Sequence, residues 1–174
     1  MYRYDPAGFT LTSGKFSHHY FNCKQITMVP AQLRRLALAI RDEIFPTLPA
    51  EPVALGGLTL GADPIALAVS LAYAEQERTI YPIIVRKAAK QHGTGKQIEY
   101  EGPDHPDGAT ILIDDVVTTG GSSIVALHAL RSAGFQVNHA LCIVDREEGG
   151  REALAAENVE LISLFLKSDF GAGA

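Results

Sequence analysis

Residues 111–123 read Ile-Leu-Ile-Asp-Asp-Val-Val-Thr-Thr-Gly-Gly-Ser-Ser, so an apolar run ends in two acids and leads into a hydroxyl-rich loop. The branched apolar residues of 109–113 predict a buried strand, which places Asp114 and Asp115 at its carboxyl end. In open α/β sheets this edge is where ligands bind. The stretch therefore predicts a ligand site at the end of a central strand.

The loop after the two acids has the composition of an anion-binding loop. Thr118–Ser123 supplies hydroxyls, and its two glycines allow backbone amides to face an anion. Apolar residues at helical spacing from Ile124 to Leu130, followed by Gly134, predict a helix over 124–133. A phosphate in the loop would meet free amides and the positive end of that helix. We therefore expect the loop to hold the phosphate of a phosphorylated sugar.

The two adjacent carboxylates would repel that phosphate unless something lies between them. The hydroxyls of a sugar, or a magnesium ion nearby, would resolve this conflict. The alternative interpretation is a solvated Asp-Asp turn followed by an ordinary helix. The attached Thr-Thr-Gly-Gly-Ser-Ser loop favours the phosphate site over this alternative.

Length and composition bound the class of protein. The 174 residues, 47% of them hydrophobic, predict one domain over residues 1–174. Fifteen basic and twenty acidic residues give a net charge of −5, which argues against nucleic acid as a partner. No apolar stretch approaches the roughly 18 residues of a membrane span, so no membrane association is expected. Two cysteines without a signal segment predict a cytoplasmic protein.

The alternation of strand and helix patterns predicts an α/β fold with a mostly parallel central sheet flanked by helices. Residues 86–108 interrupt this alternation with six glycines and prolines, and they predict a long loop or a mobile hairpin. Strands are expected at 9–13, 20–23, 53–56, 80–85, 109–113, 137–144 and 159–165, and helices at 31–45, 65–74, 124–133 and 151–157.

The interrupting segment begins with a strongly basic stretch. Four basic residues and no acid lie between Arg86 and Lys96, a local charge of +4 in an acidic chain. A cationic flap of this kind can close over a polyphosphate, and Lys90 can neutralise charge on a departing pyrophosphate while His92 adds a donor. The alternative is a solvated loop that is basic without a function. The presence of a phosphate loop in the same chain favours the functional interpretation.

Two further features leave alternatives open. The segment Gly56–Gly61 lacks dinucleotide-binding spacing, and it fits either a turn that meets a second anionic group or a simple strand-to-helix turn. Arg146 follows a predicted strand, so it also lies at the ligand edge. It could hold a substrate carboxylate through two hydrogen bonds, or pair with Glu147 or Glu148.

Four segments resemble the type I phosphoribosyltransferases, and within them the orotate phosphoribosyltransferases, over almost the whole chain. The fourth is typical of the superfamily, and the first and third indicate orotate. The segments are FTLTSGKFSHHYF at 9–21, GGLTLGADPIA at 56–66, RKAAKQHGTG at 86–95 and IDDVVTTGGS at 113–122.

The resemblance implies transfer of ribose 5-phosphate from 5-phosphoribosyl 1-pyrophosphate (PRPP) to orotate, which gives orotidine 5′-monophosphate and pyrophosphate in pyrimidine synthesis. It implies Mg²⁺ as cofactor, and no protein residue is assigned as a metal ligand. It also implies a homodimer in which residues 86–108, a flexible catalytic loop, reach the neighbouring site, and in which residues 1–30 form a hood-like segment.

The resemblance also implies a role for each site residue. Asp114 and Asp115 would contact the ribose hydroxyls, Thr118–Ser122 the 5′-phosphate, and the basic loop the pyrophosphate. Orotate would lie against Thr118 and Arg146, beside an aromatic pair. The substrate-binding residues are then Tyr20, Phe21, Arg86, Lys87, Lys90, His92, Asp114, Asp115, Val116, Val117, Thr118, Thr119, Gly120, Gly121, Ser122 and Arg146, of which Lys90, His92, Asp114 and Asp115 are catalytic.

The chain departs from the family pattern near its start. The family usually has an N-terminal helix, yet only eight residues precede Phe9, and Thr12 stands where some members have a lysine that Lys15 or Lys24 could replace. Two other functions compete with orotate transfer: transfer to another base, and a non-catalytic sensor of sugar phosphates. The basic loop and Arg146 favour orotate transfer.

Overall fold

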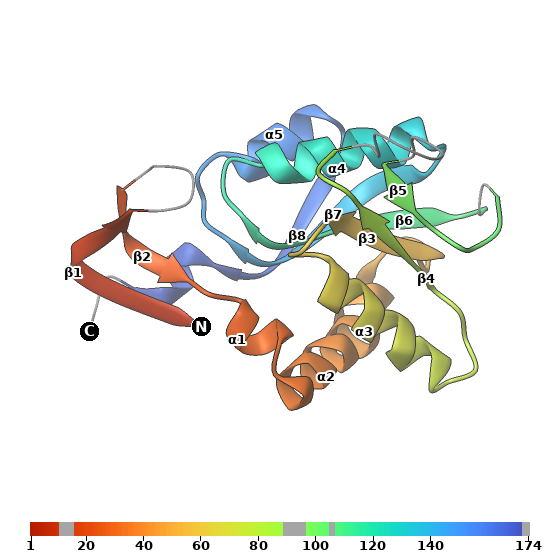
Figure 1. Cartoon of the computed structure of the whole chain (residues 1–174), viewed down its shortest axis with the longest axis horizontal. Helices are drawn as coiled ribbons and strands as arrows, with labels where there is room; N and C mark the ends of the chain where they lie inside the picture. Colours follow the sequence, from red (N-terminus) through yellow and green to blue (C-terminus); the bar gives the residue numbers. More distant parts are fainter. Residues whose placement is uncertain (11–15, 89–96, 105–106, 172–174) are drawn as a thin grey trace.

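The structure, a computed structural model, describes residues 1–10, 16–88, 97–104 and 107–171. These residues form a six-stranded sheet with helices on both faces, and a separate two-stranded hairpin (Figure 1). The strand order in the sheet is β5-β4-β3-β6-β7-β8, and every pairing is parallel except that of β5 with β4. The predicted α/β fold with a mostly parallel sheet is confirmed.

The elements alternate along the chain as the sequence predicts. The strands are β1 (Tyr2–Thr10), β2 (Phe16–Phe21), β3 (Ala54–Leu58), β4 (Tyr81–Val85), β5 (Ile98–Glu99), β6 (Ala109–Val117), β7 (Gln136–Asp145) and β8 (Glu160–Leu166). The α-helices are α1 (Lys24–Thr27), α2 (Pro30–Ala39), α3 (Asp63–Ala74), α4 (Gly121–Ser132) and α5 (Gly150–Ala156). Short turns of other helix types are η1 (Ile40–Ile44), η2 (Phe45–Thr47) and η3 (Lys167–Phe170). Within the described residues, no helix is long and apolar enough to cross a membrane.

The direction in which the sheet grows reverses between β3 and β6. From β3 the chain passes through α3 to β4 on one side, whereas from β6 it passes through α4 to β7 on the other. The helices α3 and α4 therefore cover opposite faces of the sheet (Figure 1). A reversal of this kind opens a crevice at the carboxyl ends of the two strands, where α/β proteins bind their ligands.

Both faces of the central strands are buried, as the continuous apolar runs predict. Ile111 and Ile113 belong to the core that contains α2 and α3 side chains. Leu112, between them, belongs to the second core, which contains α4 and α5 side chains. This alternation follows from the two-residue period of a strand, and it fixes β6 rigidly between two layers of helices.

The strands β1 and β2 form an antiparallel pair, the N-terminal hairpin, which stands apart from the sheet (Figure 1). The predicted strands at 9–13 and 20–23 were therefore wrong in extent, since pairing runs from Tyr2 opposite Phe21 to Thr10 opposite Phe16. The register of the pairing shifts between Tyr4 and Phe9, and this irregularity is the reason that the first part of β1 was not predicted as a strand. This bulge accommodates a proline and a glycine that interrupt the alternation expected of a strand.

The helix after the phosphate loop begins earlier than predicted. We expected it over 124–133, but α4 begins at Gly121, so Ser122 and Ser123 lie in its first turn. Its N-cap, Gly120, adopts a left-handed conformation with φ of 82°, and no local sequence signal distinguishes such a glycine from an ordinary loop residue. The predicted stop is confirmed, because Gly134 has φ of 90° just after the C-cap.

Two other boundaries differ from prediction. The helix expected over 31–45 ends as an α-helix at Ala39 and continues as a π-helical turn and a 3₁₀ turn, the latter containing Pro46. Within the 86–108 segment, β5 pairs antiparallel with β4, which directly precedes the segment. A hairpin was one of the two forms expected for this segment.

The backbone of β3 approaches its neighbour closely, and this sets up a test of the fold. A Cβ built on Gly56 would lie 1.9 Å from the carbonyl oxygen of Ile83 in β4, whereas a Cβ on Gly121 would meet no atom within 4 Å. We expect Gly56→Ala to lower the free energy of unfolding by more than about 2 kcal/mol, because strand backbone cannot move aside. Gly121→Ala, the matched control, should change it by less than about 1 kcal/mol. Urea unfolding would measure both, and equal losses would contradict the close approach.

Candidate functional site

The two acids lie where β6 runs past the end of β3. Pairing of β3 with β6 extends to Gly56 opposite Leu112, whereas pairing of β6 with β7 continues to Val117 opposite Asp145. The expectation that the strand ends at residue 113 was therefore wrong, because pairing with β7 continues β6 to Val117. Asp114 and Asp115 lie beyond the last paired residue of β3, on the side of β6 where β3 no longer covers it.

Asp114 is the most constrained group of the site. Its Oδ2 accepts a 2.7 Å hydrogen bond from the Ser123 hydroxyl of α4, and its Oδ1 accepts one of 3.0 Å from the Asp115 amide. Burial raises the pKa of Asp114 from 3.8 to about 7; the Ser123 hydrogen bond opposes the rise and the Asp115 charge adds to it. A carboxyl group with this pKa takes up or releases a proton close to neutral pH.

The turn after β3 lies directly against the two acids. A Cβ on Gly61 would come within 2.6 Å of Asp115 Oδ1 and 3.4 Å of Asp114 Oδ1, so only a glycine leaves room there. The turn is held by Thr59, whose amide donates to Val85 and whose hydroxyl donates to Asp63 at 2.6 Å. The segment Gly56–Gly61 thus forms the second wall of the crevice, across from β6.

The predicted phosphate loop connects β6 to α4. Val117 is buried and Val116 partly so, whereas Thr119, Gly121 and Ser122 are exposed. The underside of the loop packs on α5, where a Cβ on Gly150 would lie 2.6 Å from the Thr118 carbonyl oxygen. The loop therefore has a fixed inner side and an open outer side at the N-terminus of a twelve-residue helix. Such a terminus attracts anions through its free amides and its dipole.

Arg146 lies under the N-terminal hairpin, and the structure shows one of the two predicted arrangements. Its Nη2 is 2.8 Å from Glu148 Oε1 and donates to the Ser17 hydroxyl at 3.1 Å. The side chain is 6% exposed, and its Nε has no hydrogen-bond partner among the described residues. A buried donor of this kind is costly to leave unpaired, so it would gain from an acceptor on a ligand.

The predicted aromatic pair is divided between two faces of β2. Tyr20 is 41% exposed, and its ring lies 5.4 Å from that of Phe9. Phe21 is 9% exposed and packs on Tyr2 and Phe170. Because adjacent strand residues point in opposite directions, the two rings do not act as a pair. Tyr20 alone has a free face toward solvent.

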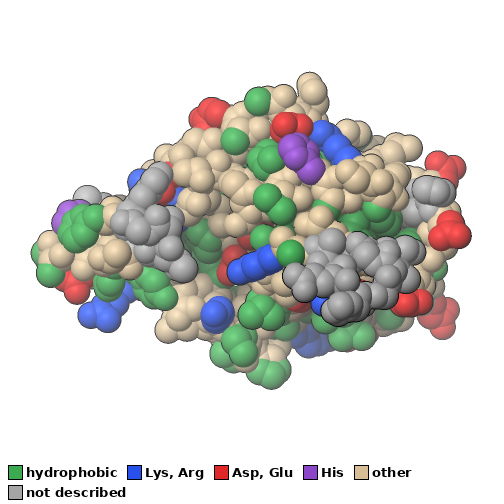
Figure 2. Space-filling model, turned by 45° about the horizontal axis from the view of Figure 1, so that its top comes forward, with side chains coloured by type: hydrophobic (Ala, Val, Ile, Leu, Met, Phe, Trp, Pro, Cys, Tyr) green, Lys and Arg blue, Asp and Glu red, His purple; other side chains and the backbone are tan. Residues whose placement is uncertain are grey.

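The basic loop is described only at its base. Arg86 Nε donates to Glu99 Oε1 at 2.7 Å across the β4–β5 hairpin, and Lys87 is exposed. Lys90 and His92 lie outside the described residues. Figure 2 shows the face that carries the hollow between the N-terminal hairpin and the rest of the molecule, with charged side chains at its floor.

The comparisons with known proteins identify the family. No model of a known protein family matches the chain. The orotate phosphoribosyltransferase of Leptospira biflexa is 49% identical over 170 residues, which are 98% of this chain and 91% of that protein. The orotate phosphoribosyltransferase of Thermosynechococcus vestitus is 44% identical over 172 residues, 97% of this chain and 87% of that protein. The chain belongs to the orotate phosphoribosyltransferase family.

A solved structure of the family agrees with this assignment. The Mycobacterium tuberculosis orotate phosphoribosyltransferase in complex with PRPP matches with a TM-score of 0.72 and 30% identity, over 87% of this chain and 83% of that one. The resemblance inferred from four sequence motifs is confirmed. The chain is therefore an enzyme of the phosphoribosyltransferase class.

Sequence reasoning missed two contacts of this orotate phosphoribosyltransferase family site: Ser123 fixes Asp114, and Ser17 holds Arg146. Glu148, which also holds Arg146, was one of its two expected partners. Ser123 had a local signal, since it ends the hydroxyl-rich loop. Ser17 had none, because its contact spans 129 residues of sequence.

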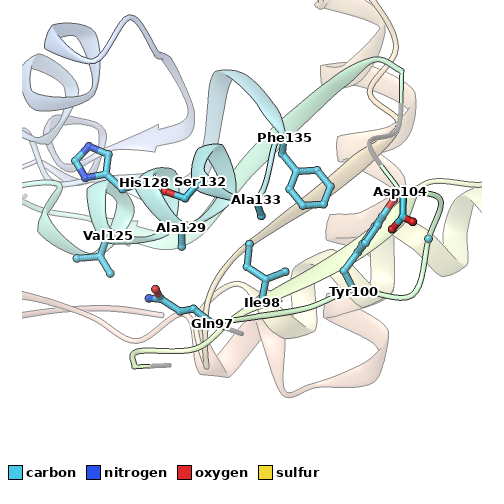
Figure 3. Close-up of a pocket in the computed structure, with 11 residues that line it drawn as sticks. Gln97, Ile98, Tyr100, Asp104, Val125, His128, Ala129, Ser132, Ala133 and Phe135 are labelled. Carbon is cyan, nitrogen blue, oxygen red and sulfur yellow. The ribbon is translucent and has the colours of Figure 1, made fainter. Parts of the chain in front are cut away.

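A cavity of about 790 Å³ lies between β5 with its following loop and the outer face of α4 (Figure 3). Ile98, Tyr100 and Phe135 form its apolar side, and His128 lies at its rim on α4. Among the residues that the structure describes, none of those predicted to bind substrate lines this cavity.

The raised pKa of Asp114 predicts a pH-dependent stability. Because the folded state holds this proton up to about pH 7 and the unfolded state releases it near 3.8, the free energy of unfolding should fall as pH rises between these values. Asp114→Asn cannot titrate, so its free energy of unfolding should lack this fall. The free energy of unfolding of the variant minus that of the parent should therefore be larger at pH 8 than at pH 4, by at least about 1.4 kcal/mol, the equivalent of one pKa unit. Thermal and urea unfolding across pH would measure it.

Ser123→Ala is the matched control for this effect. Loss of the hydroxyl removes a bond that favours the charged form, so the fall in stability should persist and extend to higher pH. Parallel pH profiles for the parent and Asp114→Asn would contradict the assignment of the effect to Asp114.

Proposed function

We propose that the crevice between β3 and β6 transfers ribose 5-phosphate from PRPP to orotate, with release of pyrophosphate. The observation that carries the proposal is the position of two carboxylates beside an open helix N-terminus, at the reversal point of a parallel sheet. The loop Thr118–Ser122 holds the 5′-phosphate through its amides and hydroxyls. Asp114 and Asp115 accept hydrogen bonds from the ribose hydroxyls.

The charges of the site match the reaction. Breaking the bond from the anomeric carbon to pyrophosphate develops positive charge on the sugar and negative charge on the leaving group. The carboxylates of Asp114 and Asp115 stabilise the first charge, and Arg86, Lys87, Lys90 and His92 stabilise the second. The acceptor is a nitrogen of the base, so the protein supplies no covalent nucleophile.

Arg146 recognises the carboxylate of orotate in this proposal. Its unpartnered Nε is buried next to the hairpin that carries Tyr20, and Thr118 lies in the neighbouring loop, which follows the partner strand of β7. An ionised donor at a dry site discriminates strongly between a base with a carboxylate and one without. Of the aromatic pair expected beside the base, Phe21 lies on the same face of β2 as Ser17, which contacts Arg146, whereas Tyr20 lies on the opposite face.

The residues fit Mg²⁺ as cofactor. Mg²⁺ prefers hard oxygen ligands and is usually held by one or two carboxylates together with substrate phosphates. Asp114 and Asp115 provide such oxygens, and the described residues contain no cluster of three acidic, histidine or cysteine groups that would hold a metal alone. When bound with PRPP, the ion would neutralise charge on the pyrophosphate.

A homodimer with a shared loop completes the proposal. Leu67 and Leu71 are 46% and 68% exposed, and their spacing of four residues places both on the outer side of α3, while Leu60, 74% exposed, lies in the turn that precedes this helix. Figure 2 shows hydrophobic side chains exposed along the lower edge of the molecule, the side on which Figure 1 places α2 and α3. An apolar stripe of this kind favours a second copy, and it begins next to Gly61 in the crevice. We further propose a single domain in the cytoplasm.

A base panel tests the substrate. Purified protein with PRPP and Mg²⁺ should consume orotate with at least about 100-fold higher kcat/KM than uracil, because uracil lacks the carboxylate that Arg146 binds. Arg146→Ala should lose a similar factor with orotate. Absorbance of the free base measures turnover, and calorimetric PRPP binding by Arg146→Ala shows that the variant is folded. Equal use of orotate and uracil would indicate another base, and PRPP binding without any turnover would indicate a sensor.

Lys90→Ala tests the loop. It should lower kcat about 100-fold or more and change the Kd for PRPP less than about threefold, because charge on the leaving group is greatest in the transition state. Steady-state kinetics and calorimetry separate the two quantities. Equal losses in both would assign Lys90 to ground-state binding.

Subunit exchange tests whether the loop acts across the dimer. A mixture of inactive Lys90→Ala and Asp115→Asn proteins should regain activity, since one site of the mixed dimer has both intact residues. The same mixture with Leu71→Glu in both chains, which places a charge in the apolar stripe, should regain none. Verified exchange without recovery would show that each loop serves its own subunit.

A further inference from the structure

The N-terminal hairpin has little to hold it in place by itself. A two-stranded pair alone is marginally stable in water, so it needs packing from elsewhere. Its Phe9 and Tyr20 rings pack on one another within the hairpin. Its other side, with Tyr2 and Phe21, faces the remainder of the chain.

The C-terminal turn η3 provides that packing. The ring of Phe170 lies 5.0 Å from Tyr2 and 5.1 Å from Phe21, one from each strand of the hairpin. It also lies 5.8 Å from Phe165 in β8. Edge and tilted contacts at these distances are favourable for aromatic rings. Phe170 therefore joins both hairpin strands to the last strand of the sheet, and Figure 1 shows the C-terminal segment beside β1 and β2.

The turn that carries Phe170 is itself tied to the substrate side of the sheet. The Ser168 amide and hydroxyl donate to the two carboxylate oxygens of Glu147 at 2.8 and 3.1 Å, and Asp169 accepts from the Leu166 amide at 2.7 Å. Glu147 follows Arg146, whose guanidinium donates to Ser17 in β2. The hairpin is thus fastened at two points, Arg146 and Phe170, which are joined through Glu147.

We infer that Phe170 is a positioning residue for the base: the C-terminal turn holds the hairpin so that Ser17 meets Arg146, the group proposed to bind the base. The inference rests on the proposed function. When the hairpin is loosened, only a fraction of molecules hold it closed, and the apparent affinity for the base falls by that fraction. We expect a smaller effect on PRPP, because the rings that Phe170 contacts belong to the hairpin and to β8, whereas the phosphate loop and the two acids lie on β6 and α4.

The test compares four proteins: the parent, Phe170→Ala, Phe170→Tyr and Phe165→Ala. Phe170→Ala should raise KM for orotate about fivefold or more, because it removes two ring contacts to the hairpin, while kcat at saturation and the Kd for PRPP stay within about twofold. Phe170→Tyr keeps the ring and should restore KM. Phe165→Ala should have the smaller effect, because the ring contact recorded for Phe165 among the described residues is the one to Phe170.

A second measurement keeps the inference separate from the proposed function. Amide hydrogen exchange within β1 and β2 should accelerate in Phe170→Ala while exchange in α4 stays unchanged. A parent without orotate turnover would overturn the proposed function, yet the exchange data would still decide whether Phe170 holds the hairpin. Unchanged exchange in the hairpin, an unchanged KM, or equal losses in KM and kcat would overturn the inference.

Discussion

Backbone pairing of β6 with β7 beyond the end of β3 is the feature on which the site depends. Because β7 continues to hold β6 to Val117, the residues after Leu112 keep extended geometry while one of their sides is open. Side chains on an unsupported loop would not hold a fixed spacing to the Gly61 turn. The same pairing directs the chain into α4, so the acids and the helix N-terminus are placed by one strand.

The site combines charges that would conflict if they were closer. Acids face the crevice at Asp114 and Asp115, and the anion-binding amides begin only after Val117. The intervening strand residues separate the two regions, so a sugar can lie between a phosphate at one end and a leaving group at the other. Residues 86–96 carry a charge of +4 in a chain whose net charge is −5, so this segment would attract an anionic substrate more strongly than the general surface.

Much of the fold could be predicted because its signals are local. Apolar runs bounded by glycines predicted the central strands, and the order of strand, loop and helix around residues 118–123 is confirmed. The hairpin strands were misplaced because a bulge breaks their alternation, and the start of α4 was misplaced because Gly120 uses a left-handed conformation that the sequence does not reveal. Tyr20 and Phe21 point to opposite faces of β2 because adjacent residues of a strand alternate between its two faces. This arrangement could have been predicted from the sequence once the strand was recognised.

The contacts that sequence could not show are those made across long separations. The hydroxyl of Ser17 and the ring of Phe170 reach the site from the two ends of the chain, and no periodicity links them to Arg146 or Tyr2. The four quoted motifs include Ser17 but not Phe170. They identify the chemistry, whereas the packing that positions it is visible only in the folded chain.

The hydrogen bonds that hold Asp114 have an entropic consequence. Ser123 and the Asp115 amide occupy both of its carboxylate oxygens before any ligand arrives, so its rotamer is selected when the chain folds. In the proposed reaction, binding then has no side-chain freedom left to remove at this residue, and the sugar would meet a group already in place. The same buried acid lowers the stability of the fold as pH rises toward 7.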